Sequence, residues 1–168
     1  MGGAKRYPSI ASYGDDGFRR LNPSHILPLQ QGLVEDRAIA VIKTDLADVY
    51  RDYIACLNKQ DWPRVGQFVH DEVIHNGRRV GLSGYREMLE RDFDEIPDLH
   101  FNIQLLISDP PYISSRLGFD CAPKATFLGL HVNGKRVFFA ENVIYEFRSE
   151  KIAQVWSVID KAAIEAQL

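Results

Sequence analysis

The sequence is poor in cysteine, carries little excess charge and lacks any long apolar run. Its two cysteines in 168 residues are too few for the disulfide framework of a small secreted domain, so a reducing compartment is the default. A formal net charge of −3 argues against a surface that binds nucleic acid or an anionic membrane. We find no apolar run long enough to span a bilayer and no basic-then-apolar secretory leader. We therefore expect a cytoplasmic protein with no nucleic-acid or membrane partner.

The histidine spacing of common metal sites is also missing. The stretch HDEVIHNG, residues 70–77, holds His70 and His75 five positions apart, whereas a zincin helix needs two histidines four apart. Five positions correspond to about 140° around a helix, and an odd separation places the two side chains on opposite faces of a strand. The remaining histidines have no ligand-like spacing: His25, His100 and His131. We expect no metal site.

The composition fits one globular domain, since 45% of the residues are apolar and 26% are charged. Residues 1–27 combine Gly, Pro, Ser and opposed charges without apolar periodicity, which is typical of an arm or mobile leader. We therefore place a single domain over residues 28–168. The chain shows no internal repeat and no low-complexity tract.

Helical periodicity dominates the first half of that domain. Apolar residues recur at three- and four-residue spacing over 39–57, which predicts an amphipathic helix that ends near Asn58. Asp61 and Pro63 begin a second, short helix. Ser83 is expected to cap a third helix, and Pro97 to end it. A short strand is expected between the last two, around residues 72–77.

After Pro97 the period of the pattern changes from about four residues to two. Residues 99–107 alternate, a second strand follows the proline pair at 110–111, and Asn133-Gly134 is the strongest hairpin signal in the chain. Helices first and four long antiparallel strands afterwards indicate an α+β fold. We expect a cone-shaped curved antiparallel sheet with helices packed over its concave face.

Three ordered segments resemble a known family. IPDLHF at 96–101, FLGL followed by NGKRV up to residue 137, and KIAQVWSVID at 151–160 are similar to the SnoaL-like polyketide cyclases, also called ester-cyclase-like proteins. The resemblance covers roughly residues 45–160. It implies the cone fold of nuclear transport factor two and ketosteroid isomerase, with a pocket on the concave face and usually a homodimer. It also implies catalysis without a metal or organic cofactor.

The resemblance also locates two departures from the family pattern. Members often carry Gly-Thr-His where residues 121–123 are Cys-Ala-Pro, and His-Trp-Asp where residues 155–157 are Val-Trp-Ser. The aspartate that serves as acid/base in aldol-type cyclases would align with Ser157. The histidine that faces it would align with Val143. The usual acid/base pair is therefore missing from this chain.

Strand parity identifies Glu141 as a replacement. If Arg148 lies opposite Ile152 across the last hairpin, Glu141 shares a face with Val143 and Ser157. A carboxylate in an apolar pocket has a raised pKa that suits proton transfer at neutral pH. The alternative interpretation is that Glu141 reaches water or pairs with an arginine.

The opposite face of these strands is also apolar. It carries Ile144, Trp156 and Val158, which we expect a second subunit to cover.

Further catalytic candidates are His75 and Asp120. His75 titrates in the physiological range, although either His75 or Asn76 can point into the pocket. Asp120 shares a strand face with Arg116, with which it can also form a surface ion pair. Tyr53, on the buried stripe of the first helix, could donate a hydrogen bond to a carbonyl oxygen. The predicted substrate-binding residues are Tyr53, Asn76, Arg116, Val143, Tyr145, Val155 and Ser157.

Two functions remain open from the sequence. The first is a cofactor-independent cyclase or isomerase that acts by acid/base catalysis on a polyketide-like or other polycyclic natural product in an apolar cone. The second is a non-catalytic ligand-binding or dimerisation module on the same fold, which the missing histidine and aspartate favour.

Overall fold

A computed structural model describes residues 45–168 of the chain. The arm predicted over residues 1–27 and the beginning of the predicted first helix lie outside the described residues. The elements, in chain order, are α1 (Leu46–Asn58), a 3-10 turn η1 (Trp62–Arg64), α2 (Val65–Phe68), β1 (Val69–His75), β2 (Arg78–Arg79), α3 (Gly81–Glu95), β3 (Asn102–Asp109), β4 (Tyr112–Cys121), β5 (Thr126–Phe127), β6 (Leu130–His131), β7 (Val137–Arg148), β8 (Lys151–Ile159) and α4 (Lys161–Glu165).

Helix α1 begins at a side-chain cap. The carboxylate of Asp45 accepts a hydrogen bond of 2.9 Å from the backbone N–H of Ala47, which satisfies one of the free donors of the first turn. Four apolar residues then fall on one stripe and are almost completely buried: Tyr50, Tyr53, Ile54 and Leu57. This stripe packs the helix against the sheet.

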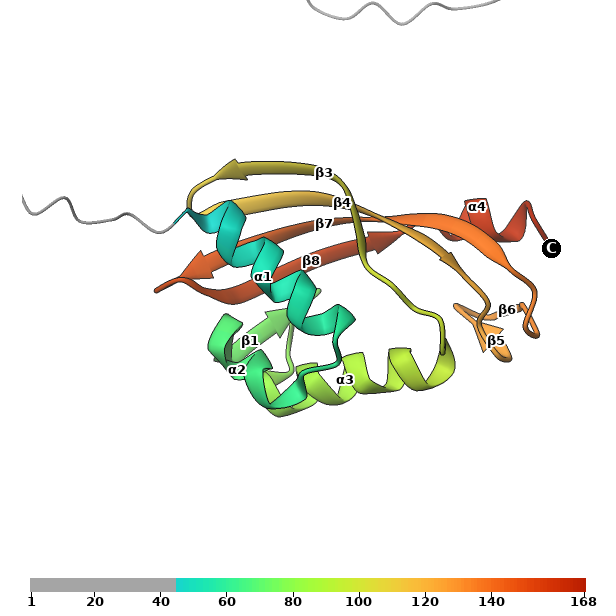
Figure 1. Ribbon diagram of the computed structural model, residues 1–168, viewed down its shortest axis with the longest axis horizontal. Helices are drawn as coiled ribbons and strands as arrows, with labels where there is room; N and C mark the ends of the chain where they lie inside the picture. The colour runs from blue at the N-terminus through green and yellow to red at the C-terminus, as the bar shows by residue number, and fades with distance from the viewer. Residues whose placement is uncertain (1–44) are drawn as a thin grey trace, which may run out of the picture. The chain divides into compact units, whose positions relative to one another are not determined.

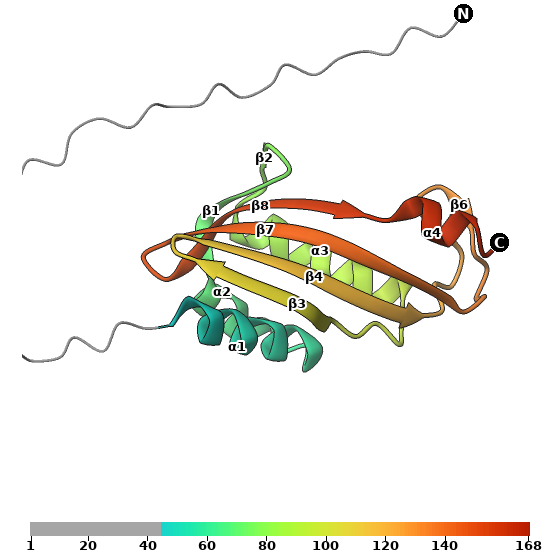
Figure 2. The same ribbon diagram turned by 90° about the horizontal axis from the view of Figure 1, so that it is seen from above.

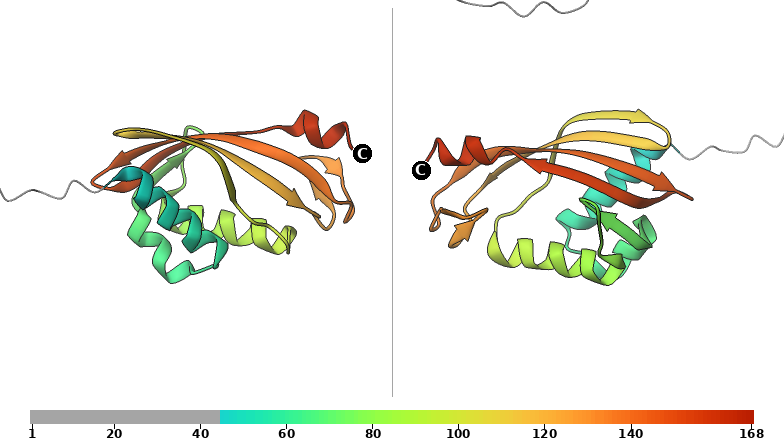
Figure 3. Two further views of the ribbon diagram at one scale, coloured as in Figure 1. Left: turned by 45° about the horizontal axis from the view of Figure 1, so that its top comes forward. Right: turned by 180° about the vertical axis from the view of Figure 1, so that it is seen from behind.

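Six strands form one curved sheet in the order β2-β1-β8-β7-β4-β3, and helices α1, α2 and α3 cover its concave face (Figures 1 and 2). The α+β fold predicted from the change of period is confirmed. The four long strands β3, β4, β7 and β8 are antiparallel neighbours as predicted. Strand β1 differs, because it runs parallel to β8, with His75 opposite Val155. Helix α3, which follows β1 in the chain and packs against it, lies on the same side of the sheet as α1 (Figure 3).

The hairpin between β7 and β8 is tighter than predicted. Arg148 lies opposite Lys151, not Ile152, because Ser149 and Glu150 both take positive φ angles and form a two-residue turn. An irregularity of the register after Glu146 then adds one residue on the β8 side. From that point the pairing is the predicted one.

Two other local predictions are wrong. Helix α3 begins at Gly81, not at Ser83, and has no side-chain cap; Gly81 has a φ of +66°, which lets the chain turn sharply out of β2. Asn133-Gly134 forms a turn but does not join two long paired strands. The two-residue strands β5 and β6 pair with each other through Leu128 and Gly129.

The C-terminal helix α4 packs beside one end of β7, where it covers part of the outer face of the sheet (Figure 1). Its residue Ile164 is fully buried. None of the helices within residues 45–168 is both long enough and apolar enough to cross a membrane.

Candidate active site

A cavity of about 240 Å³ lies between the concave face of the sheet and helices α1 and α3. Its walls are mostly aromatic and aliphatic, and the phenylalanines among them are Phe101, Phe119, Phe127 and Phe139. An apolar wall with a few convergent polar groups is typical of a small-molecule site. The polar side chains that line it come from five different elements, α1, β1, α3, β7 and β8: they are Tyr53, His75, Tyr85, Asp92, Glu141, Tyr145 and Ser157.

The carboxylate of Glu141 lies inside this cavity, where its strand parity predicts it. Ser157, on the neighbouring strand β8, donates its hydroxyl hydrogen to one carboxylate oxygen of Glu141. Burial raises the pKa of Glu141 above its ordinary value, and the hydrogen bond from Ser157 opposes that rise. A pKa raised in this way brings a carboxyl group closer to the pH at which it can both take and give a proton.

A second carboxylate, Asp92 of α3, lines the same cavity. Burial raises its pKa from 3.8 to about 6, with smaller contributions from the negative charges of Glu95 and Glu141. Asp92 is not among the site residues predicted from the sequence, although it lies seven residues after Tyr85 and three after Leu89. That spacing places it on the buried stripe of α3.

Two tyrosines and one histidine form the other polar part of the cavity. The hydroxyl oxygens of Tyr53 and Tyr85 lie 2.9 Å apart in a hydrogen bond, and burial raises the pKa of both hydroxyls. The ring of His75 lies 6.1 Å from that of Tyr85. Burial lowers the pKa of His75, so its imidazole is neutral at physiological pH. His75, rather than Asn76, is thus the residue that faces the cavity.

The cavity is short of positive charge. Of the residues described by the structure, no lysine or arginine lines it, while two carboxylates do. Within residues 45–168, no three His, Cys, Asp or Glu side chains are arranged to hold a metal ion.

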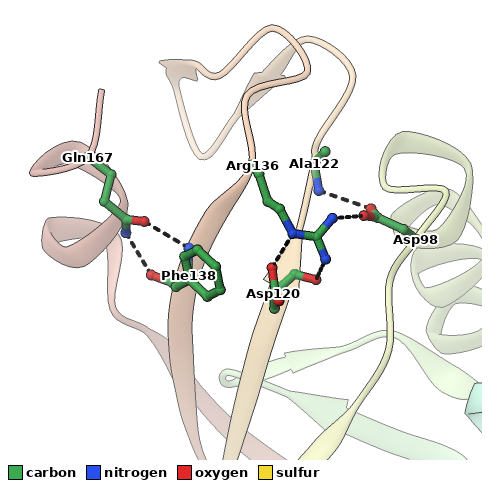
Figure 4. Close-up of polar contacts among 6 residues, drawn as sticks. All are labelled: Asp98, Asp120, Ala122, Arg136, Phe138 and Gln167. Atoms are coloured by element: carbon green, nitrogen blue, oxygen red, sulfur yellow. Dashed lines mark hydrogen bonds and ion pairs between the residues drawn. The ribbon is translucent and has the colours of Figure 1, made fainter.

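The prediction that Asp120 and Arg116 belong to the pocket is wrong. Both point to the outer face of the sheet, because they alternate with the inward-facing Leu117 and Phe119. Asp120 forms an ion pair with Arg136, not with Arg116 (Figure 4).

The same arginine reaches a second carboxylate. Arg136 also contacts Asp98 at 3.2 Å, and Asp98 accepts a hydrogen bond from the backbone N–H of Ala122. Figure 4 shows this cluster beside the pair of hydrogen bonds between Gln167 and the backbone of Phe138. The cluster joins the chain segments at this end of the sheet, and the side chain of Arg116 bonds to Asn142 instead.

Two predicted substrate-binding residues lie outside the cavity as well. Asn76 has a φ of +45° at the end of β1, and its side-chain amide accepts from the N–H and donates to the C=O of Ser157. Both hydrogen bonds tie β1 to β8. Val143 is 2% exposed in the core and is not one of the lining residues. Tyr53, Tyr145, Val155 and Ser157 line the cavity as predicted.

Comparison with known proteins agrees with this architecture. A family model described as SnoaL-like polyketide cyclase matches residues 47–168. The crystal structure of a SnoaL-like polyketide cyclase from Agrobacterium tumefaciens is 52% identical to the chain, with a TM-score of 0.73. The match covers 74% of this chain and 98% of that one.

More distant structures share the fold. TsrD from Streptomyces laurentii is 20% identical with a TM-score of 0.66, over 74% of this chain and 95% of that one. IdmH from Streptomyces antibioticus is 13% identical with a TM-score of 0.65, over 74% and 98% of the two chains. Curated proteins provide no match to the sequence.

Proposed function

Because the chain belongs to the SnoaL-like polyketide cyclase family, we propose that it is a cyclase or isomerase that acts by acid/base catalysis. It would need no metal or organic cofactor, and its substrate would be an apolar ring compound bound in the cavity. Glu141 is the proposed acid/base group.

One contact carries this proposal. Ser157 occupies the position where the family resemblance places an aspartate, and its hydroxyl hydrogen-bonds to the carboxylate of Glu141. A carboxylate from β7 therefore lies beside the place where the missing β8 carboxylate would project. Relative to the pattern that the resemblance implies, the acid of this chain stands on β7, opposite Ile159, and not at position 157 of β8.

The chemistry follows from the state of this carboxylate. The ionised form of Glu141 takes a proton from a carbon next to a carbonyl group of the substrate, which leaves an enolate and a neutral carboxylic acid. In a cyclase, the enolate carbon then adds to a second carbonyl carbon of the substrate, whose C=O π bond opens to an alkoxide that takes the proton back from Glu141. In an isomerase, the acid returns the proton to another carbon of the enolate. Asp92 lines the same space and, with a pKa of about 6, can exchange protons at neutral pH.

The cavity volume limits what the site encloses. An engineered cavity of roughly 150 Å³ holds benzene, so the observed volume of about 240 Å³ corresponds to about ten non-hydrogen atoms on that scale. The enclosed part of the ligand is therefore one or two rings. A larger polycyclic ligand would extend beyond the cavity.

A non-catalytic ligand-binding module is the second candidate function. It is favoured by Val143, which the resemblance aligns with the family's histidine, so that an apolar side chain lies opposite Ser157 across β7 and β8. The cavity would then only bind a ligand, through its shape and its apolar walls.

Proton exchange distinguishes the two candidates. α-Tetralone is a bicyclic ketone of suitable size, and nuclear magnetic resonance in heavy water reports exchange of the protons next to its carbonyl. We expect the protein to accelerate this exchange, and Glu141→Gln to lower the rate at least about a hundredfold. Glu146→Gln, the same change on the outer side of β7, is the matched control and should retain the rate. Full activity in Glu141→Gln would overturn the assignment.

We also propose that a second copy of the chain covers the outer face of the sheet. Ile144, Trp156 and Val158 are 46%, 38% and 68% exposed on that face. These three residues lie close together, because Ile144 pairs with Trp156 across β7 and β8. A contiguous apolar patch of this kind is typical of a protein interface, and the two-fold arrangement is the commonest closed assembly.

A further inference from the structure

The hydroxyl groups of Tyr53 and Tyr85 hold one hydrogen that the hydrogen bond between them does not use. The two side chains come from α1 and α3, both line the cavity, and they are 1% and 3% exposed. Each hydroxyl carries one hydrogen, and the bond between them uses only one. Within the described residues, neither hydroxyl forms another side-chain hydrogen bond. One hydrogen is therefore free in a buried site, where an unmade bond is costly.

The surroundings of Tyr53 and Tyr85 determine the protonation state of their hydroxyl groups. Burial raises the pKa of both hydroxyls above their usual value, and the charge of Glu141 adds to that effect. Both tyrosines therefore stay protonated and act as donors at physiological pH. The hydroxyl that accepts from its neighbour is polarised by that bond and becomes a stronger donor to a third group.

The charge of the cavity determines which acceptor can reach this donor. Two carboxylates, Glu141 and Asp92, line the same space, and no lysine or arginine of the described residues does. A ligand carboxylate or phosphate would meet only negative charge in a site of low dielectric constant. An uncharged oxygen such as a carbonyl group meets no such barrier.

We infer that Tyr53 and Tyr85 together form a subsite for the uncharged carbonyl oxygen of a small ketone or ester ligand. This deepens the proposed function, on which it rests, because it takes the cavity as the reaction site. In the reaction, the pair would donate a hydrogen bond to the enolate oxygen that forms when Glu141 removes the neighbouring proton. As groups that touch the ligand, the two hydroxyls would set its orientation with respect to Glu141.

A matched pair of probes isolates the carbonyl group. Tetralin has the two rings of α-tetralone without the oxygen, so the ratio of their dissociation constants measures what the oxygen contributes. We expect the double variant Tyr53→Phe/Tyr85→Phe to reduce the preference for α-tetralone over tetralin at least about fivefold relative to the wild-type protein. Tyr50→Phe, the same change on the same helix but outside the cavity lining, should leave the ratio unchanged.

The ratio of the two dissociation constants shows whether the tyrosine hydroxyls bind the ligand or only join helices α1 and α3. If the hydroxyls only join α1 to α3, the double variant weakens both probes equally, and the inference is wrong. Infrared spectroscopy of α-tetralone bound to the wild-type protein provides a test without any variant. The carbonyl stretch should lie below its frequency in cyclohexane, and a frequency equal to that in cyclohexane would contradict the subsite.

The outcome is independent of the catalytic role of Glu141. Glu141→Gln should keep the wild-type ratio of the two dissociation constants, even where it abolishes proton exchange. A protein that binds α-tetralone through the tyrosine pair but exchanges no protons would refute the proposed function and leave this inference intact. If the wild-type protein exchanges the protons of α-tetralone but the double variant keeps the wild-type ratio of dissociation constants, the proposed function stands and this inference is refuted.

Discussion

Replacing Asp92 by asparagine should stabilise the protein at about pH 8 and have little effect at about pH 4. Burial raises the pKa of Asp92 from 3.8 to about 6, so the folded state disfavours the ionised carboxylate. Below pH 3.8 both folded and unfolded chains hold the proton and no penalty exists, whereas above pH 6 both have lost it and the folded state carries the full penalty.

The size of the effect follows from the shift. A rise of about 2 pKa units corresponds to about 3 kcal/mol at about 1.4 kcal/mol per unit. Asp92 retains some contact with solvent, which screens its charge, so we expect Asp92→Asn to raise the free energy of unfolding by about 1 to 3 kcal/mol at alkaline pH. Asparagine keeps the shape of the side chain and removes the charge.

Urea unfolding at the two pH values measures this difference. Asp94→Asn removes the same charge from an exposed position of the same helix, and it should change stability by less than about 0.5 kcal/mol at either pH. This control removes the effect of net charge from the comparison. A lower stability of Asp92→Asn at alkaline pH, or an equal change in stability at both pH values, would contradict a burial penalty on the ionised Asp92 carboxylate.

Four further expectations concern other residues. The wild-type rate of α-tetralone proton exchange should fall as pH is lowered through the raised pKa of Glu141, with a midpoint above the usual value of about 4.3. Tyr50→Phe should raise the free energy of unfolding in urea by up to about 1 kcal/mol, because its buried hydroxyl, although close to the hydroxyls of Ser115 and Tyr145, has no partner in hydrogen-bond geometry within the described residues. Asn76→Ala should lower it by about 1 to 2 kcal/mol, since two hydrogen bonds to the backbone of Ser157 are lost. Val158→Lys should reduce the mass measured by light scattering to that of a monomer, and an unchanged dimer would argue against the outer-face interface.

Local periodicity was enough to predict the long helices and strands and the inward and outward faces of β7 and β8. The stripe of α1, the change of period at Pro97 and the inward position of Glu141 all follow from where successive side chains point on a helix or strand. That direction repeats every 3.6 or two residues and depends little on the rest of the chain. The α+β class and the exposure of Ile144 and Trp156 are therefore readable from the sequence.

Contacts between distant segments could not be read in this way. The parallel pairing of β1 with β8, the bonds from Asn76 to Ser157 and the partner of Asp120 each join residues far apart in the chain. Periodicity gives the face on which a residue lies, but not the neighbour it meets there.

The site itself depends on such contacts. Tyr53 and Tyr85 meet because α1 and α3 lie beside the same cavity, and Glu141 reaches Ser157 because β7 and β8 pair in one register. The sequence placed Glu141, Tyr53 and Ser157 on the right faces. Only the packing of the helices on the sheet determined that Asp92 joins them, since a polar residue on a buried stripe can equally end at a surface edge or in a cavity.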